Sequence, residues 1–512
     1  MKFHLQHILL AGGLLILAAA CKKDKGNYSY HDYFAPVVDT AGIGGPRYIE
    51  PKSYLVIEPP VSYASGDTGV LRYQWIFYPY ITGSGSNNIP VRTIGSSRQL
   101  NALIEDKVGE YRAELIVTDT SNQMKVNMIF PVVVSAGIEY GFVVLHSKDD
   151  GSDVDFITTG NNAPIAGIVP RHIRNMYSEV AGGKFTKDAR FIVQDRRTGA
   201  NQNWLLIGGA AHLSRMSGRD FSLMRQDAAF FRRPNEVIDP QAQILMTNGY
   251  NALINHGKLQ MYSTTYDEDA LFGEPNDGDY ELAPYLSFNT TYALFAAVYD
   301  EKYGKFIRPS VLYGPMGDFK PPSVNPATPQ AFDLRNIGKT MLYMDAAFNG
   351  HTHAFFKDRS GDGRWLYVVN FNKADDSAMA VMKKDMSALP EIGNALFFQA
   401  SEQGYIDLYA TDRKIYAYDY QGTNTASVVY DGLPAGETIT KMKIYKPRPA
   451  DNLSAVTGRL LYVATWNGTE GKLYEFSLNP LSGQVGTTPL NTYTGFGKIV
   501  DMNAKARGAG TY

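Results

Sequence analysis

Residues able to hold a metal ion are the first candidates for chemistry in this sequence. Asp358, Ser360 and Asp362 alternate ahead of Gly363, and oxygen ligands so spaced before a glycine are typical of the first half of a calcium loop. The glutamate that such a loop carries at its twelfth position is missing, because Val369 stands there. We therefore favour a plain hairpin turn, with structural calcium as the alternative.

Two other groups of residues have metal-ligand chemistry. His351 and His353 share one face of a predicted strand, but no third ligand stands beside them, so solvent-facing side chains are favoured. The acidic residues from Asp267 to Asp279 predict a solvated loop, with calcium again as the alternative. Apart from calcium, no cofactor is predicted.

Signatures of hydrolytic and nucleotide chemistry are missing. The sequence has no His-Glu-x-x-His, no Gly-x-Ser-x-Gly and no cysteine after position 21. Gly338-Lys339-Thr340 ends like a phosphate-binding loop, but Asp333 occupies the place of the leading glycine, so the backbone cannot wrap a phosphate. We predict no catalytic residue and no enzyme activity.

Three tryptophans are candidates for ligand binding. Trp204, Trp365 and Trp466 have the flat apolar faces that stack on sugar rings. Packing between the strands of a sheet is the favoured alternative for each of them.

The single cysteine follows an apolar leader. Residues 1–20 carry Lys2, an apolar run and small residues at the end, as a signal peptide does. Thirteen apolar residues, from Ile8 to Ala20, are too few to span a bilayer. With no second cysteine in the chain, Cys21 has no disulfide partner.

The leader resembles that of bacterial lipoproteins. Leu17-Ala18-Ala19-Ala20-Cys21 is similar to their lipobox, which implies cleavage before Cys21 and acylation of that residue, with palmitate among the acyl groups. We therefore expect residues 21–33 to form a lipidated tether on the outer membrane, at the cell surface or on the periplasmic face. An ordinary secretory signal is the alternative.

The elements that must position these residues are predicted to be β-strands. In residues 34–135, Leu71, Tyr73 and Trp75 share one side of a strand, as do Tyr111 to Val117 at period two. Over Ser53–Glu58, either Tyr54 and Val56 or Leu55 and Ile57 face the core. Frequent turns over about a hundred residues predict a β-sandwich.

Residues 137–512 contain repeated strand–turn–strand units and almost no helical periodicity. Examples turn at Asp149-Asp150-Gly151, His256-Gly257, Gly361-Asp362-Gly363 and Gly468 to Gly471. Hairpins that recur along the chain in this way predict a β-propeller of about seven blades. Two further β-sandwiches are the alternative, and the fold class is all-β in either case.

The charge of the chain excludes little beyond nucleic acid as a partner. The formal net charge is −2 and 44% of residues are hydrophobic, which also excludes wholesale disorder. The charged residues from Arg171 to Arg233 are mostly basic, and the charged residues from Pro234 to Glu301 are mostly acidic. Such segments can pair with each other, form a bipolar surface or lie in solvent, which is the favoured case.

The first domain carries a family resemblance. Tyr73-Gln74-Trp75, Gly109-Glu110-Tyr111 and Leu115-Ile116-Val117-Thr118-Asp119 resemble the PKD-type immunoglobulin-like fold. That resemblance implies that the tryptophan packs in the core and that the tyrosine closes a corner. Phe77-Tyr78-Pro79-Tyr80 replaces the family's Gly-Asp-Gly turn, as in a divergent branch.

The opening also carries a resemblance, over the residues from Cys21 through Asp32 with Gly26-Asn27-Tyr28. It resembles that of a PKD-like lipoprotein family of bacteria with starch-utilisation-type outer-membrane uptake systems. This resemblance implies a lipid-anchored binding protein that captures an oligosaccharide or peptide for a transporter or another envelope partner. A propeller enzyme, either a glycosidase or a lyase with channel carboxylates, is one alternative. An adhesive or structural envelope protein is the other.

Overall fold

The computed structural model describes most of the chain after residue 34. The residues described are 35–64, 66–80, 89–135, 137–164, 169–196, 203–233, 235–246, 249–263, 269–287, 296–309, 312–324, 330–447 and 453–506. The predicted signal peptide, its tether and Cys21 lie outside them. No helix within the described ranges is long and apolar enough to cross a membrane.

The described residues from 35 to 135 form two sheets and a short strand pair. The strands are β1 (Val37–Val38), β2 (Arg47–Ile49), β3 (Ser53–Ile57), β4 (Val61–Ser62), β5 (Leu71–Pro79), β6 (Arg92–Gly95), β7 (Leu100–Ile104), β8 (Gly109–Asp119) and β9 (Lys125–Val134). One sheet has the order β2-β9-β8-β5-β6, while β3 pairs with β7 and β1 with β4. All pairs are antiparallel except β2 with β9.

The core of this sandwich lies between the alternating apolar faces of its strands. Trp75 is fully buried and packs against Phe130, with ring centroids 5.5 Å apart. In β3 it is Leu55 and Ile57 that face the core, whereas Tyr54 is exposed. The Tyr111 hydroxyl donates to the carbonyl of Lys107, 2.8 Å away, which is the corner that the resemblance implied.

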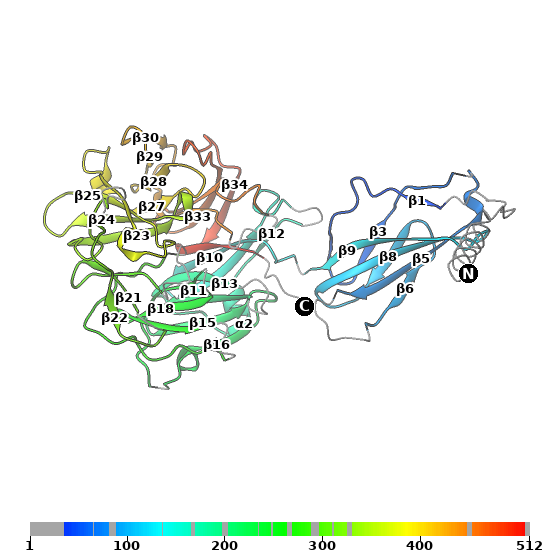
Figure 1. Cartoon of the computed structure of the whole chain (residues 1–512), viewed down its shortest axis with the longest axis horizontal. Helices are drawn as coiled ribbons and strands as arrows, with labels where there is room; N and C mark the ends of the chain where they lie inside the picture. The colour runs from blue at the N-terminus through cyan, green and yellow to red at the C-terminus, as the bar shows by residue number, and fades with distance from the viewer. Residues whose placement is uncertain are drawn as a thin grey trace, which may run out of the picture.

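The rest of the described chain forms seven sheets of three or four antiparallel strands (Figure 1). The first three sheets contain β10 (Gly141–Lys148), β11 (Gly151–Thr158), β12 (Arg171–Ile173), β13 (Ala189–Arg196), β14 (Asn203–Gly209), β15 (His212–Ser217), β16 (Leu223–Gln226), β17 (Pro240–Leu245), β18 (Tyr250–Asn255) and β19 (Lys258–Ser263). The next two contain β20 (Val298–Asp300), β21 (Lys305–Pro309), β22 (Met316–Asp318), β23 (Lys339–Ala346), β24 (Thr352–Asp358), β25 (Arg364–Val369) and β26 (Ala380–Asp385). The last two contain β27 (Phe397–Ala400), β28 (Ile406–Ala410), β29 (Ile415–Asp419), β30 (Thr425–Tyr430), β31 (Thr438–Ile444), β32 (Leu460–Trp466), β33 (Gly471–Ser477) and β34 (Asn491–Phe496).

The first of these sheets is completed by the end of the chain. β35 (Lys498–Lys505) pairs antiparallel with β10, which gives the order β12-β11-β10-β35. The short helices of the described chain lie in connections. They are α2 (Met176–Ala181) and the 3-10 turns η1 (Thr68–Val70), η2 (Asp227–Phe230), η3 (Phe348–Gly350), η4 (Asp376–Ala378) and η5 (Ile392–Asn394).

Apolar side chains packed between neighbouring sheets close the seven sheets into a ring. A separate buried cluster joins each sheet to the next, for example Leu145 with Ile207 and Phe355 with Phe398. The seventh cluster joins the last sheet back to the first, where Phe142 stacks on Tyr462 at 3.8 Å between ring centroids. Seven small antiparallel sheets that pack face to face in a closed ring define a β-propeller.

The predicted hairpins are confirmed by strand pairing. β10 pairs with β11, β18 with β19, β24 with β25 and β32 with β33 across the turns expected from the sequence. The fold class, an all-β chain with an immunoglobulin-like sandwich before a propeller of about seven blades, is confirmed.

The basic and acidic segments meet between neighbouring sheets. Arg190 Nη1 lies 2.6 Å from Asp239 Oδ1, and Arg233 pairs with Glu274. Both pairs are partly or largely exposed, so each contributes little to stability. Pairing between the segments is therefore present, although most of it lies at the solvent boundary.

Candidate functional site

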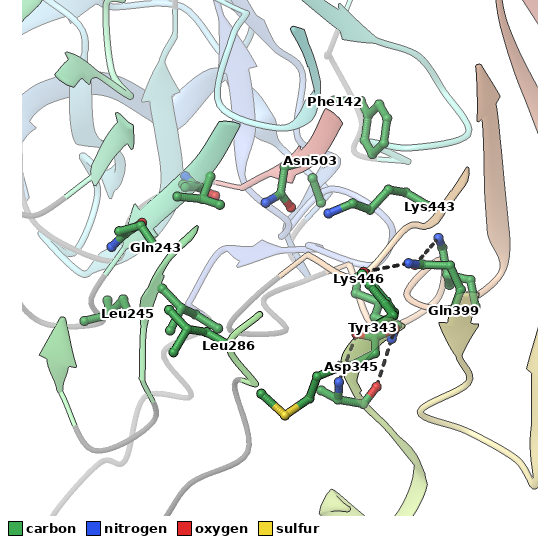
Figure 2. Close-up of a pocket in the computed structure, with 17 residues that line it drawn as sticks. Phe142, Gln243, Leu245, Leu286, Tyr343, Asp345, Gln399, Lys443, Lys446 and Asn503 are labelled. Carbon is green, nitrogen blue, oxygen red and sulfur yellow. Dashed lines mark hydrogen bonds and ion pairs between the residues drawn. The ribbon is translucent and has the colours of Figure 1, made fainter. Parts of the chain in front are cut away.

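A cavity of about 210 Å³ lies among the inner ends of the propeller sheets (Figure 2). Its lining includes residues from β13, β17, β23, β27, β31 and β35, which are the edge strands on the inner side of six sheets. Leu286 reaches it from the connection before β20. Six elements that are far apart in sequence thus contribute to one wall.

Asp345 and Lys446 form an ion pair in this wall. Lys446 Nζ lies 2.8 Å from Asp345 Oδ2 and 2.9 Å from the carbonyl of Ala346. Asp345 Oδ2 also accepts the N–H of Ala400 at 3.0 Å. The carboxylate is therefore neutralised and held in position by groups of the protein.

A second carboxylate lies beside the cavity on β35. Asp501 Oδ1 is 3.1 Å from Lys441 Nζ and 3.6 Å from Lys443 Nζ, and Oδ2 accepts the N–H of Ile192 at 3.1 Å. Burial would raise the pKa of Asp501, but the two lysines and this N–H hold it below its usual range. The cluster of one carboxylate and two ammonium groups carries one excess positive charge.

Neutral polar side chains complete the lining. Gln399 Nε2 donates to the Tyr343 hydroxyl at 2.9 Å, and its Oε1 accepts the N–H of Ile444 at 3.0 Å. Burial, with Asp345 and Asp501 nearby, raises the pKa of Tyr343 well above its usual value. Its hydroxyl therefore stays protonated at physiological pH.

Gln243 is tied to a buried network behind the wall. Its Nε2 donates to Asn251, Asn251 donates to Asp195, and the Tyr262 hydroxyl donates to Asp195 at 3.0 Å. Burial raises the pKa of Asp195, although the neighbouring Arg215 opposes this. The network fixes the direction in which the Gln243 amide points.

The predicted calcium ligands occupy a hairpin instead of the cavity. Asp358 ends β24, pairs with Lys339 and accepts the Trp365 Nε1–H at 3.0 Å. A lysine ammonium therefore supplies the positive charge that the calcium alternative assigned to a metal ion. Ser360 and Asp362 lie in the exposed turn before Gly363. Across the described ranges, no group of three or more His, Cys, Asp and Glu is placed to hold a metal.

The two histidines have separate surroundings. His353 is fully buried, and its Nδ1 lies 2.9 Å from both carboxylate oxygens of Asp407. It is a core histidine, whereas the sequence favoured a solvent-facing one. Burial lowers the pKa of the half-buried His351. Of the acidic loop, Asp267 lies outside the described residues, while Asp279 pairs with Lys302 at the surface.

None of the three predicted ligand-binding tryptophans lines the cavity. Trp204 packs on a cluster between the second and third sheets, with the Arg215 guanidinium 3.9 Å from its ring. Trp365 lies beneath Lys339 and Lys383 at the side of the fifth sheet. Trp466 is half-buried at the end of β32. Packing explains the first two.

The cavity residues were missed in the sequence although a signal exists. Each of the six inner strands that line the cavity places a polar residue among apolar ones: Gln194, Gln243, Asp345, Gln399, Lys443 and Asn503. A polar side chain recurring within buried strands of a propeller indicates a channel position. Register alone does not show which of the strands is the inner one.

The fold and the cavity define a class: an all-β protein with an immunoglobulin-like sandwich followed by a β-propeller that has a polar central cavity. Within it, the sequence model of the PKD-like family matches residues 21–188, which include the whole sandwich and the beginning of the propeller. No curated protein matches the chain.

Several solved structures are similar to this chain at low identity. A quinonprotein alcohol dehydrogenase-like protein from Bacteroides thetaiotaomicron is 13% identical with a TM-score of 0.43, covering 91% of this chain and 97% of that one. AztD from Citrobacter koseri is 10% identical with a TM-score of 0.34, covering 85% and 98%. The extracellular domain of a putative one-component system from B. thetaiotaomicron is 9% identical with a TM-score of 0.38, covering 78% and 58%. These likenesses carry no conclusion about what this chain binds.

Proposed function

We propose that this protein is a lipid-anchored binding protein of the cell envelope that captures a small nutrient ligand in the central cavity of its propeller. The observation that carries the proposal is the convergence of six inner strands on one polar cavity. A lipoprotein-like leader directly followed by Cys21 supports placement at the outer membrane. Delivery of a glycan or peptide fragment to a transporter is the role that suits such a protein.

Binding without turnover is favoured by the charges of the site. A glycosidase needs a carboxyl group whose pKa is raised so that it can donate a proton. Asp345 is instead paired with Lys446, and the pKa of Asp501 is lowered by Lys441 and Lys443. Neither carboxylate is suited to act as a general acid.

A ligand panel tests this proposal. The mature chain without its lipidated residue, residues 22–512, is titrated with mono- and oligosaccharides and short peptides, and the recovered ligands are analysed by mass. We expect one class to bind at about micromolar Kd and to be recovered intact. Time-dependent cleavage would favour the enzyme instead.

A variant that fills the cavity locates the binding. Leu286→Trp adds bulk from a connection and should abolish binding, whereas Leu481→Trp, at an exposed position away from the cavity, should not. Equal binding by both variants would place the ligand elsewhere and reject the central cavity. No binding by the unaltered chain to any member of the panel would favour an adhesive or structural role.

A further inference from the structure

The cavity wall has one ammonium group that the protein leaves largely uncommitted. Lys446 is occupied by Asp345 and Ala346, and Lys441 lies 3.1 Å from Asp501. Lys443 lines the cavity, and the only partner found for its Nζ among the described residues is Asp501 at 3.6 Å, beyond hydrogen-bond distance. Figure 2 shows its side chain extending across the cavity in the direction of Asn503.

A protonated hydroxyl lies in the same wall. The Tyr343 oxygen accepts from Gln399, which leaves its own O–H free to donate. An ammonium and a phenol that both keep donor capacity in a largely buried site favour an oxyanion. Asp345 in the wall and Asp501 beside it do not oppose this, since the three lysines around these two carboxylates leave one positive charge in excess.

Acceptors for hydroxyl groups are present as well. Because Asn251 presents its amino group to Asp195, its oxygen faces Gln243, and the Gln243 amino group is used there. The carbonyl oxygen of Gln243, a buried side chain of the lining, has no hydrogen-bond partner in the described part of the chain. A buried acceptor left unpaired costs free energy that a hydroxyl of a ligand would recover.

We infer that the cavity binds a small hydroxylated carboxylate, with its anionic group at Lys443 and a hydroxyl group at Gln243. The cavity volume of about 210 Å³ is below the roughly 300–1,000 Å³ of drug-sized sites, so the ligand is of about one sugar ring. A monosaccharide acid has this chemistry, either free or as the end of an acidic oligosaccharide. This inference rests on the proposed binding function and narrows its ligand class.

Paired titrations of the mature chain test the inference. D-galacturonate and D-galactose differ in the carboxylate, and calorimetry should give at least a tenfold lower Kd for the acid, as a charged hydrogen bond predicts. A third titration, with trigalacturonate, distinguishes a free monosaccharide acid from the end of an acidic oligosaccharide as the ligand. A Kd for the trimer equal to or below that of the monomer indicates a chain end, and a higher one indicates the free acid.

Lys443→Met should remove the preference for the acid, and Lys443→Arg should retain it. Lys302→Met is the matched control, because it removes one positive charge at the outer surface and should leave the preference intact. Equal affinity for acid and neutral sugar, or a preference that survives Lys443→Met, overturns the inference. If neither sugar binds while another panel ligand binds in the cavity, the inference fails and the proposed function stands; if nothing binds, both fail.

Discussion

Trp75 shows how one side chain can organise a sandwich that has no disulfide. It is fully buried, packs on Phe130 and donates its Nε1–H to the carbonyl of Ser97 at 2.9 Å. Trp75→Ala therefore leaves a large cavity and should lower the free energy of unfolding of the sandwich by about 3–5 kcal/mol. Chemical denaturation followed by tyrosine and tryptophan fluorescence measures it.

The control for this change is on the opposite face of the same sandwich. Tyr54→Ala removes a ring that is 63% exposed and should change the stability by less than about 0.5 kcal/mol. A loss below about 1 kcal/mol for Trp75→Ala would contradict the assigned core.

Asp155 is a buried carboxylate whose ionised form is stabilised by its neighbours. His146 Nε2 lies 3.2 Å and His172 Nε2 2.8 Å from its oxygens, and the N–H of Asn175 donates at 2.9 Å. Burial would raise the pKa of Asp155, but these contacts hold it well below its usual value. The group therefore stabilises the fold above its unfolded-state pKa, and this contribution is lost as pH falls towards its folded-state pKa.

We expect the thermal midpoint of the propeller to fall on acidification below about pH 4. Asp155→Asn should lower stability by about 3 kcal/mol at pH 7 and flatten this acid limb. Asp150→Asn, at an exposed carboxylate in the turn before β11, should do neither. If the thermal midpoint of Asp155→Asn falls with acidification as it does in the unaltered chain, other carboxylates cause that fall. Thermal unfolding followed by circular dichroism between pH 3 and 7 measures it.

A lysine stabilises the hairpin of β24 and β25. Lys339 of β23 and the indole of Trp365 both bind the Asp358 carboxylate. Adding calcium at millimolar concentration should therefore leave the thermal midpoint unchanged, whereas Lys339→Met should lower stability by about 1 kcal/mol. Calorimetric scans with and without the ion decide this.

Lys339→Met also removes the positive charge beside Asp358, so this variant is the one in which calcium is most able to bind. If Lys339→Met gains stability from calcium and the unaltered chain does not, the lysine occupies a latent cation position. A midpoint that rises with calcium in the unaltered chain would instead support the calcium loop.

Strands and turns were predictable from the sequence because their signals are local. Trp75 and Leu71 reveal a buried face by their spacing, and Gly361-Asp362-Gly363 reveals a turn by composition. The cavity was not predictable in this way. Gln243, Lys443 and Asn503 come from three sheets, and only the closure of the ring brings them to one wall.

Tryptophan type alone did not identify the residues that line the cavity. Trp204 and Trp365 have large apolar faces, and propeller sheets cover such faces with neighbouring side chains. Whether a tryptophan packs between sheets or can stack on a ligand depends on how far its strand lies from the centre of the ring. The alternation of apolar and polar side chains along a strand does not give this distance.

For the whole molecule, attachment to the membrane is predicted to depend on Cys21. Cys21→Ser should move the protein from the membrane fraction to the soluble fraction, because acylation needs the thiol. Fractionation with detergent partitioning measures this, and a Lys22→Ser variant serves as control for the tether. Unchanged membrane partitioning of Cys21→Ser would remove the anchor from the proposed function.

The pairing of β35 with β10 has a consequence for how the protein is made. The N–H of Gly497, just before β35, donates to Nδ1 of His146 in β10, which lies 351 residues earlier in the chain. Within β35, Asn503 lines the cavity and Asp501 lies beside it. While the chain is synthesised from its N-terminus, β10 remains without its inner neighbour and the cavity wall is incomplete. A copy that terminates before β35 therefore lacks both the closure of the ring and part of the cavity wall, so we expect the proposed binding to require translation of the last strand.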